Sequence, residues 1–99
     1  MARSSKVESG FQDRLRTTIL ERYPGSMVFK MDSPQGIPDL LILYEDKWAS
    51  LENKKSKDAK HQPNQDHYVE RMNDMSFSRF VYPENREQVL DELDQHFRS

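Results

Sequence analysis

The chain has 99 residues, of which 34% are hydrophobic and 32% are charged, and its formal net charge at pH 7 is -2. This length predicts one domain with a small core, and the absence of cysteine excludes disulfides and thiolate metal sites. The net acidity counts against a protein that coats DNA through its overall positive charge.

We expect neither export nor membrane insertion from this sequence. No apolar stretch approaches the roughly 20 residues of a membrane span, and the N-terminal segment lacks the apolar core of a signal peptide. We therefore expect a single domain over residues 1–99 with a flexible tail at 1–6, no membrane association and a cytoplasmic location.

Residues 7–23 have the spacing of an amphipathic helix. Apolar residues recur every four positions from Val7 to Ile19, and Pro24-Gly25 ends the pattern. In residues 27–32, Met27, Phe29 and Met31 alternate with the intervening residues, which predicts a short strand. Residues 33–36 then predict a turn or loop.

Two further strands are expected at residues 39–44 and 48–54. The first contains an unbroken apolar run, which is typical of a strand buried on both faces, and a polar turn at 45–47 joins it to the second. In the second strand, the period of two places Glu52 and Lys54 on one face of the sheet and Asn53 on the other.

The rest of the chain predicts two helices separated by one strand. The first helix spans 63–76 with Pro63 at its first position, a short strand follows at 79–82, and the last helix spans 84–97. The order α-β-β-β-α-β-α predicts an α/β fold with a central mixed sheet, flanking helices and a C-terminal helix.

Two carboxylates and a lysine fall at neighbouring strand ends. Asp39 begins one strand and Glu52-Asn53-Lys54 ends the next, so the three side chains can meet at one sheet edge. Hard cations prefer oxygen ligands, and a cation held there can activate a water near a phosphate, beside the fixed charge of Lys54. The segment therefore indicates metal-dependent hydrolysis of a phosphodiester.

The E-x-K triplet alone is weak evidence, because Glu45-Asp46-Lys47 is a second match. That triplet lies in an expected turn, where charged residues are ordinary solvated surface, so we assign the chemistry to Glu52 and Lys54. For Asp39, the alternative is a turn residue that bonds nearby backbone amides. The neighbouring Glu52 and Lys54 favour the site.

Four blocks of the sequence together resemble a known family. Gly36-Ile37-Pro38-Asp39, followed one strand later by Glu52-Asn53-Lys54, looks like the core of the PD-(D/E)XK nuclease superfamily. With Glu8-Ser9-Gly10-Phe11-Gln12 and Gln62-Pro63-Asn64-Gln65, the chain resembles the small stand-alone VRR-Nuc nucleases of phages. The resemblance implies a restriction-endonuclease-like α-β-β-β-α-β core and, for a phage protein, the host-cell cytoplasm.

The resemblance also implies a Mg²⁺- or Mn²⁺-dependent phosphodiesterase. Asp39, Glu52 and the backbone carbonyl of Asn53 would be metal ligands, and Glu8 would be a further ligand, directly or through water. Lys54 would orient the attacking water or stabilise charge on the phosphorane. For Glu8, the alternative is a carboxylate that interacts favourably with the helix dipole.

Gln65 corresponds to the motif glutamine of the family, and its spacing from Tyr68 and Val69 places it on the inward face of its helix. A glutamine there needs hydrogen-bond partners, which a phosphate oxygen or Lys54 would provide. The alternatives are that Gln65 is a solvated helix residue, or that Gln62 takes its place.

Asn53 departs from the family, which usually has an apolar residue between the catalytic pair. Its carbonyl can still bind a metal, but its side chain faces the other side of the sheet. An unpaired amide there costs about 1 to 3 kcal/mol, so we expect a partner or local solvent.

Three lysines, Lys55, Lys57 and Lys60, follow the catalytic strand directly. We expect them to contact DNA phosphates, and the alternative is a solvated loop. His61 and His67 are six residues apart and share no helical face, so we expect surface residues rather than a zinc site.

These features predict a divalent-metal-dependent DNA endonuclease without an organic cofactor. Because one small chain carries one site, paired cuts in duplex or branched DNA, such as a Holliday junction, need a homodimer. The branched substrate rests on family analogy. The alternative is a non-catalytic DNA- or protein-binding adaptor on the same fold, which the net acidity and Asn53 favour slightly.

Overall fold

In the computed structural model, the backbone is described for residues 6–99 and the side chains for residues 10–99. The expected flexible tail at 1–6 lies outside the described residues except for Lys6, which begins the first helix. The elements are α1 (Lys6–Arg22), β1 (Met27–Lys30), β2 (Leu40–Tyr44), β3 (Lys47–Asn53), α2 (Gln65–Met75), β4 (Ser78–Val81), the 3₁₀ turn η1 (Pro83–Asn85) and α3 (Arg86–Arg98).

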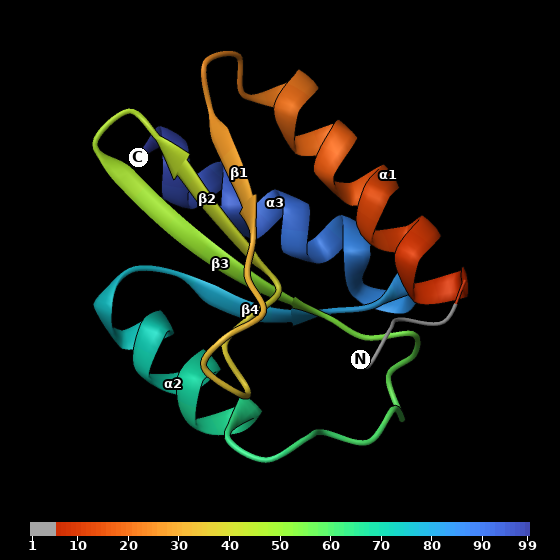
Figure 1. Ribbon diagram of the computed structural model, residues 1–99. Coiled ribbons are helices and arrows are strands. Elements are labelled where there is room, and N and C mark those ends of the chain that lie inside the picture. The colour runs from red at the N-terminus through yellow and green to blue at the C-terminus, as the bar shows by residue number, and fades with distance from the viewer. Residues whose placement is uncertain (1–5) are drawn as a thin grey trace.

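The four strands form one mixed sheet in the order β1-β2-β3-β4. β1 pairs with β2 and β2 with β3 in antiparallel fashion, whereas β3 and β4 are parallel. Figure 1 shows α1 and α3 together on one side of the sheet and α2 on the other. The expected α/β class, with a mixed sheet, flanking helices and a C-terminal helix, is confirmed.

The hydrophobic core lies between the sheet and the pair α1 and α3. The four-residue spacing in α1 directs Phe11, Leu15 and Ile19 toward the sheet, where Leu15 and Ile19 are fully buried. From the sheet, Ile42 and Leu51 pack into the same core. Burying these side chains is the main source of stability in a chain this small.

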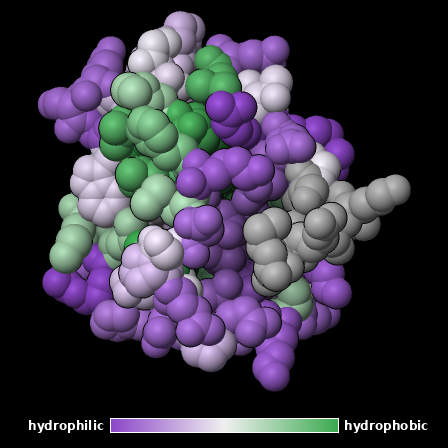
Figure 2. Space-filling model, viewed as in Figure 1, coloured by the Kyte–Doolittle hydropathy of each residue, from purple (hydrophilic) through white to green (hydrophobic). Residues whose placement is uncertain are grey.

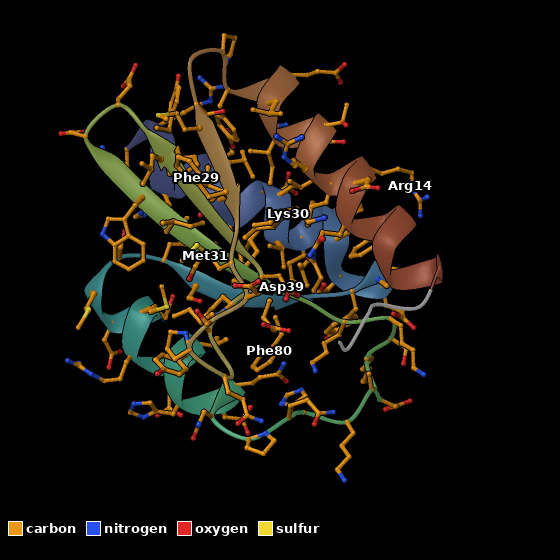
Figure 3. All side chains as sticks on the ribbon, viewed as in Figure 1. Arg14, Phe29, Lys30, Met31, Asp39 and Phe80 are labelled. Atoms are coloured by element: carbon orange, nitrogen blue, oxygen red, sulfur yellow. The ribbon has the colours of Figure 1, made fainter. Side chains whose placement is uncertain are left out.

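The other face of the sheet is only partly covered. α2 packs on β3 and β4, and β1 and β2 are left with Met27, Phe29 and Leu43 exposed at 53%, 41% and 36%. Figure 2 shows a hydrophobic area here, bordered by hydrophilic surface. Figure 3 shows Phe29 and Met31 on one side of β1 and Lys30 on the other, as strand alternation requires.

Two expected helix starts were wrong. α2 begins at Gln65 rather than Pro63, because Asn64 adopts a left-handed conformation with φ 73° that no helix interior accepts. α3 begins at Arg86, after the 3₁₀ turn η1. The Asn85 side chain holds that turn, since it accepts a hydrogen bond from the Tyr82 N–H.

The strand bounds differ from the expected ones by a few residues at most. β3 ends at Asn53, although the N–H of Lys54 still donates to the carbonyl of Val81 at 2.8 Å. Among the helices of residues 6–99, none combines the length and the apolar character that a membrane span requires.

Candidate functional site

Asp39 and Glu52 meet at the edge of the sheet where β2 begins and β3 ends. Leu40 pairs with Leu51, so one step further along the same antiparallel register Asp39 lies beside Glu52 on the same face. Oδ2 of Asp39 accepts a hydrogen bond of 3.0 Å from the backbone N–H of Asn53. The carboxylate is thus bonded across the strands to β3.

Glu52 is an almost fully buried carboxylate, with 3% of its surface exposed. Its Oε2 accepts a hydrogen bond of 3.0 Å from Nε2 of Gln65. Its Oε1 is buried and accepts no well-aligned hydrogen bond among the described residues, and the side chain and backbone of Asp39 are its close polar neighbours. Burial, and after it the negative charge of Asp39, raise the pKa of Glu52 to about 8, while Lys54 acts in the opposite direction.

Gln65 connects Glu52 to the loop before α2. It is buried, and its Oε1 accepts a hydrogen bond of 2.8 Å from the N–H of Gln62 while its Nε2 donates to Glu52. Both ends of the amide are therefore engaged, which fixes its orientation. Gln62 itself is exposed and contributes its backbone, so the inward glutamine is Gln65.

Gly36 brings the loop before β2 against the turn that starts α2. It has φ 91°, and a Cβ there would lie 2.7 Å from the carbonyl oxygen of Pro63 and 2.7 Å from Cβ of Asn64. Only glycine fits this contact without a shift. The loop that carries Asp39 and the helix that carries Gln65 are therefore packed directly on each other.

Lys54 completes the cluster at the end of β3. It is buried, and its Nζ donates a hydrogen bond of 3.1 Å to the carbonyl of Lys60. Its positive charge is close enough to oppose the rise in the pKa of Glu52. A fixed cation therefore stands beside two carboxylates.

Asn53 faces the opposite side of the sheet, as the alternation with buried Leu51 requires. Its side chain is 2% exposed, and neither Oδ1 nor Nδ2 has a hydrogen-bond partner among the described residues. The expected partner or local solvent is thus not found within residues 10–99. At 2% exposure the side chain also has little access to bulk solvent.

The fourth predicted ligand cannot be placed. Glu8 belongs to α1, but its side chain lies outside the described residues. Within the side chains at 10–99, no group of three or more histidines, aspartates and glutamates is gathered as for a metal ion. Of the predicted ligands, the structure brings together Asp39 and Glu52, and Asn53 follows Glu52 on the same strand.

The charged connection between β3 and α2 borders the cluster. Lys55, Lys57 and Lys60 are all exposed on it. Of two further cations that the sequence did not single out, Lys30 extends from β1 toward α1, whereas Arg14 extends outward from α1, away from Asp39 (Figure 3). Both are exposed, and because Lys30 pairs with Leu40, its side chain lies on the face of the sheet opposite to that of Asp39.

His61 and His67 are exposed, as expected, but His61 is more than a solvated residue. Its ring stacks on Phe80 with centroids 4.1 Å apart and planes 16° apart. Phe80 pairs with Glu52 in the parallel register of β3 and β4. No local pattern indicates that pairing, so the sequence did not point to Phe80.

The arrangement offers oxygen donors of the kind that hard cations prefer, with the positive charge of Lys54 near them. Two carboxylates and a backbone carbonyl are the oxygen ligands that Mg²⁺ and Mn²⁺ accept, and the buried Oε1 of Glu52 is available for one of them. Comparison of the chain with protein-family models, with curated proteins and with solved structures found no match.

Proposed function

We propose that this chain is a divalent-metal-dependent DNA endonuclease that hydrolyses phosphodiester bonds. The observation that carries the proposal is the buried Glu52 beside Asp39, with one oxygen held by Gln65 and the other without a well-aligned hydrogen bond among the described residues. Burying a carboxylate next to a second one is costly unless a cation or a proton offsets the charge. Such a pair is more consistent with a binding site than with a structural role.

The element order supports a finer assignment of the fold. We propose that α1, the three antiparallel strands, α2 and the parallel strand β4 correspond to the restriction-endonuclease-like α-β-β-β-α-β core. In that assignment, Asp39 and Glu52-Asn53-Lys54 occupy the positions of the family motif, as the small stand-alone VRR-Nuc nucleases of phages have it.

Mg²⁺ or Mn²⁺ would be held by Asp39, Glu52 and the carbonyl of Asn53, with Glu8 as a further ligand from α1. The donor set fits such an ion, because it offers oxygen atoms alone and one of them is buried without a well-aligned hydrogen bond among the described residues. When bound, the ion supplies positive charge at the scissile phosphate and lowers the pKa of a water molecule.

The chain itself contributes orientation and charge. Gln65 fixes the carboxylate of Glu52, and the N–H of Asn53 fixes that of Asp39. Lys54, held by the carbonyl of Lys60, stabilises the negative charge that develops on the phosphate. Preorganised groups of this kind need not rearrange during the reaction.

DNA would reach the site along its basic borders. Lys55, Lys57 and Lys60 are exposed on one side, and we propose that they contact backbone phosphates. The exposed apolar face of β1 and β2 supports a homodimer, in which two sites act on both strands of a duplex or of branched DNA such as a Holliday junction.

The test compares cleavage of branched and linear DNA in the presence of Mg²⁺. We expect the wild-type protein to cut and the Glu52→Gln variant to be slower by about 100-fold or more, since it loses a metal ligand. Glu45→Gln in the exposed second E-x-K triplet is the matched control and should cut at the wild-type rate. No cleavage by the wild type, or equal cleavage by wild type and Glu52→Gln, would sink the proposal.

A second candidate is a non-catalytic DNA- or protein-binding adaptor. It is favoured by the absence, among the described side chains, of a third acidic or histidine ligand beside Asp39 and Glu52. Calorimetric titration with Mn²⁺ separates the two functions. A nuclease should bind the ion in a manner that Asp39→Ala abolishes, whereas an adaptor should be indifferent to it.

A further inference from the structure

An aromatic pair stands next to the candidate active site. Phe80 lies directly opposite Glu52 in the β3–β4 register, and residues paired in this way have their side chains on the same face of the sheet. The ring of His61 lies flat against Phe80, with centroids 4.1 Å apart. In Figure 3, Phe80 lies on the side of Asp39 that faces α2.

The ring of His61 is held from two directions while part of it stays open. Phe80 covers one ring face, and Nδ1 donates a hydrogen bond of 2.6 Å to Oδ1 of Asp66. The side chain nevertheless keeps 38% of its surface exposed. It lines a hollow of about 610 Å³ together with Lys60, Pro63 and His67. An aromatic face with a fixed orientation is therefore presented to solvent.

The backbone on both sides of His61 is bonded to the candidate catalytic residues. The carbonyl of Lys60 accepts the hydrogen bond from Nζ of Lys54. The N–H of Gln62 donates to Gln65, which in turn donates to Glu52. The position of the His61 ring is therefore tied to the position of the reacting groups.

Resting on the proposed nuclease function, we propose that His61, backed by Phe80, is a stacking platform for an unpaired DNA base next to the cleaved phosphate. Aromatic side chains stack on any base, because every base has a π face. The DNA base would lie on the ring of His61 and add a third ring to the Phe80–His61 stack. The exposed Lys57 and Lys60 would hold the adjoining phosphates. The preferred substrate is then DNA with an unpaired base at a branch, a bulge or a frayed end.

Fluorescence of 2-aminopurine tests the platform directly, because stacking quenches it. The probe is a DNA duplex with 2-aminopurine as a single unpaired base, compared with the same base in a fully paired duplex. Titration uses the Glu52→Gln protein, for which we expect cleavage to be slower by about 100-fold or more, so that the DNA stays intact during the measurement. We expect quenching of the unpaired base, and about tenfold weaker binding of that DNA when His61→Ala is added. His61→Tyr, which keeps a ring, should restore quenching.

His67→Ala is the matched control. It removes a second exposed histidine from the same hollow, but the ring of His67 stands edge-on to Tyr68 and does not stack on Phe80. It should leave the quenching unchanged. If His61→Ala quenched the unpaired base as strongly as His67→Ala does, the platform would be overturned. This conclusion would hold even if thermal melting showed that His61→Ala is less stable. If His61→Ala does not fold, His61→Gln, which lacks a ring, takes its place.

Cleavage assays with otherwise wild-type chains keep the two proposals apart. Loss of the preference for unpaired over paired DNA in His61→Ala would support the platform. If the wild type cuts DNA but His61→Ala keeps both its preference and its quenching, the platform falls and the nuclease stands. If the wild type never cuts, the nuclease proposal falls. The comparison of quenching by His61→Tyr, which has a ring, and His61→Ala, which has none, then still decides whether the platform exists.

Discussion

Burying the charged carboxylate of Glu52 costs free energy that the rest of the fold must offset. Its carboxylate is 3% exposed and lies beside Asp39, and these two causes raise its pKa to about 8. Gln65 donates one hydrogen bond to it and Lys54 supplies a nearby positive charge, yet the pKa remains high. Without a bound cation, the folded chain therefore prefers Glu52 protonated at neutral pH.

This preference predicts how stability varies with pH in the absence of divalent cations. The ordinary pKa of Glu52 is 4.5 and the folded value is about 8, so the folded state binds more protons than the unfolded state between these values. The free energy of unfolding should fall as the pH rises through this window, with a limiting slope of about 1.4 kcal/mol per pH unit. Denaturant unfolding of the wild type at several pH values measures it.

The Glu52→Gln variant isolates this contribution, because glutamine does not titrate. Its unfolding free energy should change much less from pH 5 to 8 than that of the wild type, and it should be the more stable protein at pH 8. Glu45→Gln changes the same group in an exposed turn and should follow the wild type. If the unfolding free energies of wild type and Glu52→Gln changed equally with pH, the pKa of Glu52 would not be raised in the folded state.

Asn53 presents the opposite case, a buried polar group with no visible role for its side chain. Both of its side-chain polar atoms lack a hydrogen-bond partner among the described residues. We expect Asn53→Leu, which has a similar shape, to raise the free energy of unfolding by about 1 to 3 kcal/mol. Thermal and denaturant melting measure this, and Mn²⁺ binding should persist because the backbone carbonyl remains.

Asn73→Leu is the comparison for that variant. The Oδ1 of Asn73 accepts a hydrogen bond from the N–H of Ser78, so its loss should lower stability. A destabilised Asn53→Leu would contradict the prediction and show that the Asn53 side chain does have a hydrogen-bond partner.

At the scale of elements, hydrophobic spacing predicted the order of helices and strands. The spacing of four in α1 and the apolar run of β2 are local signals, and period-two alternation correctly put Glu52 on the face opposite Asn53. The inward position of Gln65 followed in the same way from Tyr68 and Val69.

The rest depends on how elements dock, which no local pattern encodes. The stacking of His61 on Phe80 requires β4 to pair in parallel with β3. The hydrogen bond from Lys54 to the carbonyl of Lys60 depends on the path of a long polar loop. The start of α2 was misplaced because proline favours a first helical position, whereas the left-handed Asn64 fixed it two residues later.

The contact between Gly36 and the turn before α2 yields a prediction about element docking. Gly36→Ala adds a Cβ that would lie 2.7 Å from the Pro63 carbonyl oxygen, at a φ of 91° that alanine disfavours. We expect it to displace the start of α2, lower the melting temperature and weaken Mn²⁺ binding through Gln65 and Glu52.

Gly25→Ala is the control that separates backbone strain from the clash. Gly25 has nearly the same φ, 90°, but nothing lies within 4 Å of the Cβ that alanine would add there. It should show only the modest cost of a left-handed alanine and no change in Mn²⁺ binding. Equal effects of the two substitutions would mean that the contact with Pro63 does not matter for the site.

In the molecule as a whole, the two faces of the sheet are covered by helices to different extents. One face is packed against α1 and α3, and the other is covered by α2 only over β3 and β4. The uncovered part exposes Met27, Phe29 and Leu43 next to one another on β1 and β2, since Met27 pairs with Leu43. Contiguous apolar surfaces bordered by polar groups are typical of interaction sites.

A second copy of the chain is the occupant we propose for this surface, because each copy carries one candidate site and two cuts need two sites. Sedimentation velocity should give twice the monomer mass for the wild type. Phe29→Lys should give the monomer, since a charge in the centre of an apolar contact is costly to bury. Met75→Lys is the control, because Met75 is 62% exposed but belongs to α2 and not to β1 or β2. It should remain dimeric.

In cleavage assays, Phe29→Lys should still nick one strand, because Asp39 and Glu52 are untouched, but it should lose paired cuts in branched DNA. A monomeric wild type, or paired cuts by Phe29→Lys, would contradict the dimer.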